Sequence, residues 1–418
     1  MSRTKRWVFS LLILAMGLLV AWRILVVGMS DHYTRKAGLG DPQAADSALL
    51  WNGSQPRALY LKGYALMETD PESSEEFLRQ SIALNPGDAD PMESLARLQM
   101  QSGRTAQADR LIELAVARMP ANKGVRLRAA DYWVARGKLD RALSNWTAVL
   151  ELDRNQGGQI YPLLMRLAEN PKTLGVFRAL MQSPPSWWDD FFAYLAANAG
   201  KLETVVNVAT LRHATEVPLS ARERALLVER LQKEQQWPEA YLVWINGLDK
   251  EQRRYLGSVF DGGFELPPGE GGFFWHFPEH KAWIIRRKHT YGGEGEKSLH
   301  ILYRGEPTPV HQVHQYLLLG KGRYLLQLRA RVDRLRIPSG LQWVVRCAED
   351  NGRVLGASSP LVGASDWEMQ QFRFEVPDSL DCRGQVLRLE ISDAGAELPV
   401  VEGEVWFDRI SIRKLPRE

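Results

Sequence analysis

The residues of this chain that could carry out chemistry are scattered, and no spacing joins them into a catalytic motif. The sequence contains no Gly-x-Ser-x-Gly, Walker, His-Glu-x-x-His or dinucleotide-binding motif. His311 and His314 have the spacing of metal ligands on a helix, but on a strand this spacing directs the two side chains to opposite faces. Glycan cleavage would need paired carboxylates across a groove, and the sequence identifies no such pair. We therefore expect a protein that is not an enzyme.

The amino-acid composition limits which classes of partner and which kinds of site can be expected. The 418 residues carry a net charge of +3 without a basic block, which gives no reason to expect a nucleic-acid partner. The two cysteines, Cys347 and Cys382, exclude a cysteine-based zinc site and a disulfide-dense fold but permit one bridge.

The N-terminal segment predicts a membrane helix. Residues Trp7–Met29 are apolar except for Arg23, and a helix that spans the bilayer needs roughly 20 such residues. Arg3, Lys5 and Arg6 precede the run, which favours a cytoplasmic N-terminus. A cleaved signal peptide is the alternative, but the run is long and no convincing cleavage site follows it. We expect an uncleaved single-pass anchor in a bacterial inner membrane, with the bulk of the chain in the periplasm.

The expected periplasmic location affects the oxidation state predicted for the two cysteines. An oxidising compartment makes a disulfide between Cys347 and Cys382 plausible, although two free buried thiols remain the alternative.

A repeat follows the anchor. Ser74, Ala108 and Ala142 lie 34 residues apart, and one full unit reads as two amphipathic helices over 91–101 and 106–118. This period, the Ala108/Ile112/Ala115 triplet and the closing Pro120 resemble the tetratricopeptide repeat (TPR). The resemblance implies an α-solenoid that holds protein partners. Helical spacing continues irregularly, so we assign 56–258 to this domain.

Trp187 and Trp188 interrupt the repeats at a predicted helix start. Adjacent tryptophans could anchor a protein partner, because such rings concentrate interface energy. Alternatively they fill gaps between irregular repeats, which we favour because buried aromatic area is the commoner use.

From about residue 259 the pattern changes to short alternating runs separated by glycine and proline, which predicts an antiparallel β-sandwich over 259–418. The expected strands are 283–287, 298–303, 312–318, 322–331, 342–347, 367–376, 386–391 and 403–413.

Three motifs give this region a family resemblance. An opening Asp-Gly-Gly-Phe-Glu at 261–265, a Gly-x-x-Ser-Leu run at 295–299 and an aspartate after aromatic residues at 406–408 stand in order. Together they resemble the galactose-binding-like jelly roll of carbohydrate-binding modules. The resemblance implies a structural calcium ion, for which Glu265 and Asp408 would be the ligands. Arg409 stands where the family often has a second aspartate, so these carboxylates could instead cap loops or pair with arginines.

Sugar recognition needs exposed aromatic faces and planar polar groups. Trp283 and Tyr291 have polar or glycine neighbours near a loop and are our candidates for carbohydrate binding. Trp367 and Trp406 match positions that the family fills with buried rings.

The expected fold is therefore multidomain, with α and β parts. Residues 1–29 form a basic tip and transmembrane anchor, 30–55 a lead-in linker, 56–258 a TPR-like solenoid and 259–418 a β-sandwich. The whole resembles membrane-anchored TPR proteins of bacterial surface-polysaccharide clusters, which implies a non-catalytic adaptor in exopolysaccharide or O-antigen assembly or export. The second hypothesis is a scaffold that binds only proteins, and the third is a glycan-modifying enzyme. No cofactor is expected other than the structural calcium.

Overall fold

A computed structural model describes residues 3–349, 352–392 and 398–416 of the chain. It separates into two compact units, Met1–Ile160 and Tyr161–Glu418, each with its own contacts. The first unit is helical, and the second contains further helices followed by two antiparallel sheets. The expected fold class, an α-solenoid followed by an antiparallel sandwich, is confirmed.

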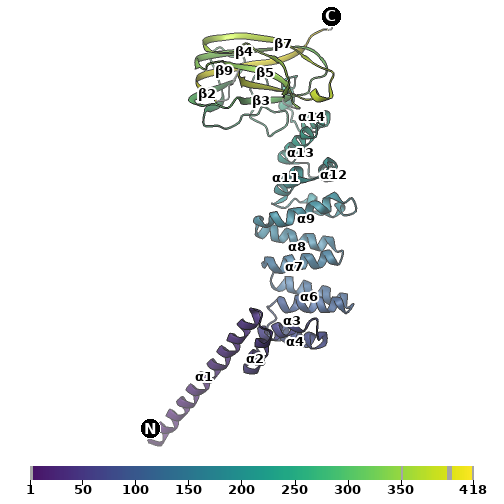
Figure 1. Ribbon diagram of the computed structural model, residues 1–418, viewed down its shortest axis with the longest axis vertical. Helices are drawn as coiled ribbons and strands as arrows, with labels where there is room; N and C mark the ends of the chain where they lie inside the picture. Colours follow the sequence, from purple (N-terminus) through teal and green to yellow (C-terminus); the bar gives the residue numbers. More distant parts are fainter. Residues whose placement is uncertain (1–2, 350–351, 393–397, 417–418) are drawn as a thin grey trace. The chain divides into compact units, whose positions relative to one another are not determined.

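The first unit consists of antiparallel helix pairs (Figure 1). Small residues make the close crossings: Ser74, Ala108 and Ala142 are fully buried, and the Ser74 hydroxyl donates to the Gly63 carbonyl over 2.6 Å. Gly103 and Gly137 adopt positive φ in the turns between paired helices, a conformation that glycine takes without strain. The helices are α1 (Arg3–Gly38), α2 (Pro42–Trp51), α3 (Pro56–Leu66), α4 (Pro71–Leu84), α5 (Asp90–Gln101), α6 (Thr105–Arg118), α7 (Lys123–Ala135), α8 (Leu139–Leu152) and the start of α9 (Gly157–Glu169).

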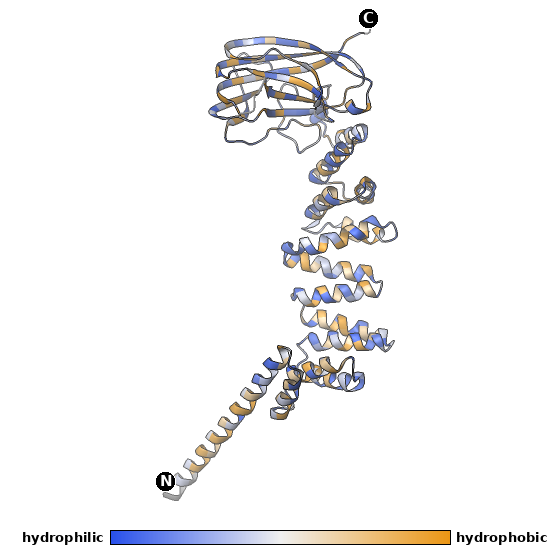
Figure 2. Ribbon diagram, viewed as in Figure 1, coloured by the Kyte–Doolittle hydropathy of each residue, from blue (hydrophilic) through white to orange (hydrophobic). Residues whose placement is uncertain are grey.

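Helix α1 begins with basic residues and is then mostly apolar along its first part (Figure 2). The stretch Phe9–Gly38 is long and apolar enough to cross a membrane, as a membrane anchor or a signal sequence would be. The helix does not stop at Met29. It continues to Gly38, and buried Ser30 donates its hydroxyl to the Ala48 carbonyl of α2 over 3.0 Å. Most of the expected lead-in is therefore packed helix.

The second unit begins with the irregular helices that the sequence indicates. They are the rest of α9, α10 (Arg178–Gln182), α11 (Trp188–Asn198), α12 (Leu202–His213), α13 (Ala221–Lys233) and α14 (Trp237–Asn246). Trp187 and Trp188 are 0% and 1% exposed, and they pack among Tyr161, Phe177 and Phe191. The favoured interpretation, that these two rings fill gaps between irregular repeats, is confirmed by their burial, and the alternative that they anchor a partner is wrong.

Within the described residues, the strands of the second unit form a five-stranded sheet, ordered β1-β2-β9-β4-β7, and a four-stranded sheet, ordered β3-β8-β5-β6. Alternate apolar side chains fill the space between them, with Phe264, Trp343 and Phe407 fully buried. Cys347, at the end of β5, forms a disulfide with Cys382. The strands are β1 (Trp283–Lys288), β2 (Ser298–Pro307), β3 (His311–Leu317), β4 (Gly322–Arg336), β5 (Leu341–Cys347), β6 (Val354–Ala357), β7 (Gly363–Val376), β8 (Gln385–Ile391) and β9 (Val400–Lys414).

Candidate functional site

The outer face of the five-stranded sheet carries a row of aromatic and basic side chains. The register places His300 of β2 opposite Trp406 of β9, and Trp406 opposite Arg331 of β4. Arg286 of β1 lies opposite His300 and extends the row. Side chains alternate between the two faces of a strand, so Phe407 points into the core whereas Trp406 belongs to the outer face.

Side chains of this row stack on the indole of Trp406. The rings of His300 and Trp406 are nearly parallel, with centroids 4.7 Å apart, and the Arg331 guanidinium lies 4.9 Å from the Trp406 centroid. The Lys288 ammonium lies 5.9 Å from the same ring. Trp406 is only 7% exposed, because these polar side chains rather than the core cover it. The layer combines a flat ring with planar hydrogen-bonding groups.

Glu404 orients the ring of His300 through a hydrogen bond. Its Nε2 lies 2.6 Å from Glu404 Oε2, so the imidazole donates to the carboxylate. Burial, with Lys288 and Arg286 nearby, lowers the pKa of His300 below its ordinary value and favours the neutral ring. Nδ1 of His300 and Nε1 of Trp406 are buried and have no hydrogen-bond partner in the described part of the chain.

A second aromatic group lies where β7 meets the loop between β1 and β2. Trp367 of β7 donates its indole N–H to the Tyr291 carbonyl over 3.1 Å, and the Arg329 guanidinium lies 5.2 Å from the Trp367 centroid. Tyr291 itself is 92% exposed. Glu294 of the same loop pairs with Arg329 at 3.3 Å and with Arg409. The structure therefore presents one predicted residue, Tyr291, beside rings that the sequence analysis assigned to the core.

Trp283 does not belong to this surface. It is 5% exposed, packs in the sandwich core, and donates its indole N–H to the Pro278 carbonyl over 2.8 Å. The prediction that Trp283 offers an exposed platform is wrong, because its side chain lies on the core face of β1, whereas the exposed Arg286 and Lys288 lie on the opposite face.

Glu265 and Asp408 come together beneath the loop that bears Tyr291. Glu265 Oε1 accepts the Glu296 N–H over 2.9 Å, and Asp408 Oδ2 accepts the Glu294 N–H over 2.7 Å. Asp408 is 1% exposed, and no ion pair of this carboxylate exists among the described residues. Burial, and then the charge of Glu265, raises the pKa of Asp408. Arg329 opposes this shift, and Arg287 lies close enough to Glu265 to interact with its charge. Two close carboxylates are the kind of oxygen ligand that Ca²⁺ takes, although a complete site would need further oxygens from backbone carbonyls and water.

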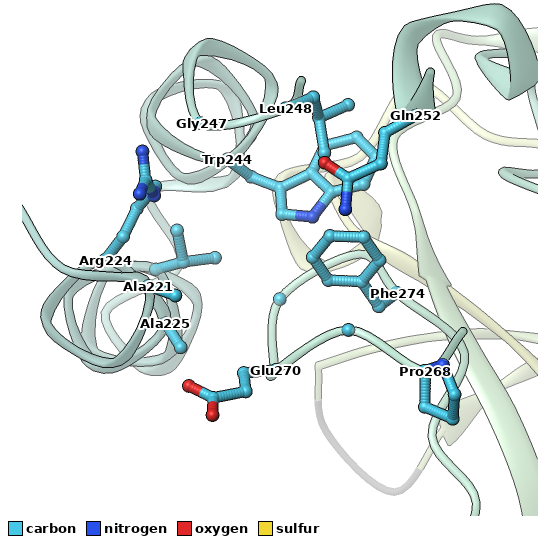
Figure 3. A pocket seen from close by; sticks show the side chains of 13 residues that line it. Ala221, Arg224, Ala225, Trp244, Gly247, Leu248, Gln252, Pro268, Glu270 and Phe274 are labelled. Atoms are coloured by element: carbon cyan, nitrogen blue, oxygen red, sulfur yellow. The ribbon is translucent and has the colours of Figure 1, made fainter. Parts of the chain in front are cut away.

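A separate cavity of about 270 Å³ lies between α13, α14 and the glycine-rich segment 268–272 (Figure 3). Trp244 and Phe274 form much of its apolar wall, with centroids 5.4 Å apart in an edge-to-face arrangement. Arg224 and Glu270 lie at different sides of the cavity and point apart (Figure 3). Trp244 is 4% exposed and Phe274 is partly buried, so little of the Trp244 ring is open to a ligand.

The acidic groups of the row and the adjoining loop include Glu404, Glu294 and Glu296. Glu404 is hydrogen-bonded to His300, and Glu294 pairs with Arg329 and Arg409. In the described ranges no group of three or more His, Cys, Asp and Glu side chains could hold a metal. What remains is a surface of rings, guanidinium groups and one exposed phenol, which suits contact with a flat, hydroxyl-rich ligand.

Sequence reasoning missed Trp406, His300 and Arg331 as a group. The signal that could have found the first is the alternation Glu404, Trp406 against Val405, Phe407, which places a tryptophan on the polar face of its strand. His300 and Arg331 lie in distant segments, and only the order of strands brings them beside Trp406.

No protein-family model matches the sequence, and no curated protein matches it. Solved structures with similarity include a CBM4 structure, 16% identical, that covers 38% of this chain and 99% of that one with a TM-score of 0.28. The CBM22-1 xylan-binding domain of Paenibacillus barcinonensis Xyn10C is 14% identical and covers 38% and 94% of the two chains, with a TM-score of 0.26. MamA from Desulfovibrio magneticus RS-1 is 22% identical and covers 31% of this chain and 75% of that one, with a TM-score of 0.26.

Proposed function

We propose that this protein is a non-catalytic adaptor that binds glycan through the outer face of its five-stranded sheet and protein partners through its helical repeats. The observations that carry the proposal are the layer of His300, Trp406 and Arg331 and, at the edge of the same sheet, the exposed Tyr291 in contact with Trp367. A buried donor without a partner costs free energy, so a ligand hydroxyl that reaches Trp406 Nε1 when Arg331 or Lys288 moves aside would be stabilised.

Helix α1 supports the membrane part of the proposal. It is apolar over the length of a bilayer and runs without interruption into the pair it forms with α2. As an uncleaved anchor in a bacterial inner membrane, it would hold the helical repeats directly at the periplasmic surface. There the adaptor would serve assembly or export of a surface polysaccharide such as an exopolysaccharide or O-antigen.

The helical repeats offer a surface for a protein partner on α3. Tyr60 and Tyr64 lie with ring centroids 5.9 Å apart, and the Arg57 guanidinium lies 4.6 Å from the Tyr60 centroid. Tyr64 is 49% exposed. Tyrosine and arginine carry much of the energy of protein interfaces, which supports this patch as the contact.

Glycan binding by the full-length protein in detergent is the decisive measurement. We expect saturable calorimetric binding to surface polysaccharide fragments, weakened by Tyr291→Ala and by Trp367→Ala. Tyr64→Ala removes a similarly exposed phenol from the first unit and serves as the matched control, which should bind glycan normally.

The control also tests the second half of the proposal. Tyr64→Ala should reduce co-purification of partner proteins from crosslinked membranes, whereas Tyr291→Ala should not. If no glycan binds while partner capture survives, the chain is a scaffold for proteins alone. Hydrolysis or elimination of the bound glycan would instead contradict the non-catalytic assignment.

A further inference from the structure

The charges on the sheet face specify the kind of glycan it would hold. Arg286, Lys288 and Arg331 surround the His300–Trp406 pair, and in the described part of the chain none of the three forms an ion pair with a carboxylate. Arg286 and Lys288 are exposed, and Arg331 is partly buried against Trp406. Three unpaired cations thus border one flat ring.

The nearby carboxylates are already engaged. Glu404 accepts from His300, Asp333 pairs with Arg334, and Glu402 pairs with Arg336. On the other side, Glu294 is shared by Arg329 and Arg409, which leaves that group with an excess of positive charge. A neutral His300 leaves the charge of Glu404 in place, but Arg286, Lys288 and Arg331 outnumber this carboxylate, so the surroundings of the His300–Trp406 pair are cationic.

We propose that the glycan bound by this face is anionic, with carboxylates on its sugar rings that pair with Arg331, Lys288 and Arg286. This inference rests on the proposed glycan-binding role. Arg331 would contribute most, because a guanidinium already held flat over an indole loses little freedom on pairing and matches a carboxylate with two parallel N–H groups. Neutral rings would leave the three cations without partners and gain only the contacts with Tyr291 and Trp367.

The test compares a short oligogalacturonate with its carboxyl-reduced, neutral form, both titrated into the full-length protein without calcium. We expect the acidic oligomer to bind more tightly and its affinity to fall as salt screens the charges. Arg331→Gln and Lys288→Gln should each weaken acidic binding about two- to fivefold, the scale of an exposed ion pair. Each substitution should weaken binding of the neutral form by a smaller factor, so that the preference for the acidic form falls.

Arg353→Gln is the matched control. It removes an exposed arginine next to β6, on the other sheet, and should leave both affinities unchanged. The side chain of Lys288 is exposed, and its loss opens no space in the core. A loss of binding in Lys288→Gln is therefore not explained by misfolding.

The outcomes separate the two proposals. Equal affinity for the acidic and neutral oligomers, insensitive to salt and to Arg331→Gln, would overturn the anionic assignment and leave glycan binding intact. Binding of neither oligomer by a folded protein would overturn both.

Discussion

The indole of Trp237 lies against the backbone of Gly384, so closely that a Cβ on Gly384 would fall 2.1 Å from Trp237 Cε2. Trp237 begins α14, and Gly384 immediately precedes β8. The same indole lies 5.6 Å from Tyr316 and 6.3 Å from Phe273, centroid to centroid. Within the second unit, the last helices therefore pack against the sandwich through aromatic side chains. The domain boundary predicted between residues 258 and 259 separates the two sides of this contact.

Gly384→Ala tests this contact. The added methyl group must displace either the indole or the strand, and overpacking of this kind costs about 1–3 kcal/mol. We expect a lower melting temperature of the second unit in calorimetry of the full-length chain. Gly320→Ala is the control, since a Cβ there would meet no atom within 4 Å. Equal effects of the two substitutions would show that the helix–sheet contact is not tight in solution.

Much of the fold follows from periodicity alone. The predicted helices 91–101 and 106–118 correspond to α5 (Asp90–Gln101) and α6 (Thr105–Arg118), because each has a complete apolar face and a glycine turn between them. The eight predicted strands all exist. The additional strand, β6, is four residues long with no fully buried side chain, so it leaves no alternating pattern to read.

The site was less predictable, because it depends on which strands are neighbours. Strand β9 lies between β2 and β4, and a single sequence gives no sign of that order. Trp406 could be placed on a strand but not beside His300 and Arg331. Trp283 was misjudged for a related reason: it begins its strand next to a polar loop, and only the packing of the two sheets shows that its indole is buried.

The buried carboxylate of Glu223 gives a second prediction. Its Oε1 accepts the Trp188 indole N–H over 2.6 Å and pairs with Arg212 at 3.2 Å, and all three side chains are buried. Glu223→Ala leaves the Arg212 charge buried without its carboxylate, which costs about 3–5 kcal/mol. We expect a large fall in the melting temperature of the second unit.

Glu203→Ala supplies the comparison for Glu223, since it removes an exposed glutamate from the first turn of α12. It should change the melting temperature by only a few degrees. A similar small change for Glu223→Ala would mean that Arg212 finds other partners, such as the carbonyls of Met181 and Val217 that it already contacts.

The disulfide should contribute to the stability of the sandwich. Cys347 and Cys382 are 35 residues apart, and closing a loop of that length restricts the unfolded chain by roughly 3–4 kcal/mol. Unfolding in the presence of dithiothreitol should occur at a lower temperature than without it. The double variant Cys347→Ser/Cys382→Ser should melt at that lower temperature whether or not reductant is present. If reductant leaves the wild-type transition unchanged, the bond does not form in the purified protein.

Stability should also depend on pH through two histidines. The rings of His276 and His314 stack with centroids 4.6 Å apart. Burial, and then the neighbouring His276, lowers the pKa of His314 to about 4, and Arg388 and His311 act in the same direction. In the unfolded chain a histidine pKa is about 6.5. Between these values the unfolded state binds more protons, so stability contributed by neutral His314 is present above pH 6.5 and is lost as pH falls to 4.

Asp261 complicates a single pH curve, because burial raises its pKa to about 6 and protonation there favours the folded state. Comparison with His314→Gln isolates the histidine. We expect the wild type to lose melting temperature relative to the variant as pH falls from about 6.5 to 4, and not below. His213→Gln, at an exposed position, should stay parallel to the wild type. Parallel curves for His314→Gln would show that the stacked pair is already accessible to protons in the folded state.

Calcium should stabilise the loop that carries Tyr291. Glu265 and Asp408 hold this loop through the N–H groups of Glu296 and Glu294, and their mutual repulsion raises the cost of keeping both ionised. A divalent ion between them would remove that cost, so we expect millimolar calcium to raise the melting temperature above that in chelator. Asp408→Asn retains an acceptor for the loop but removes one charge, and it should abolish the calcium effect. The exposed Asp366→Asn should not. If wild-type melting is the same with calcium and with chelator, the two carboxylates hold the loop as hydrogen-bond acceptors without an ion.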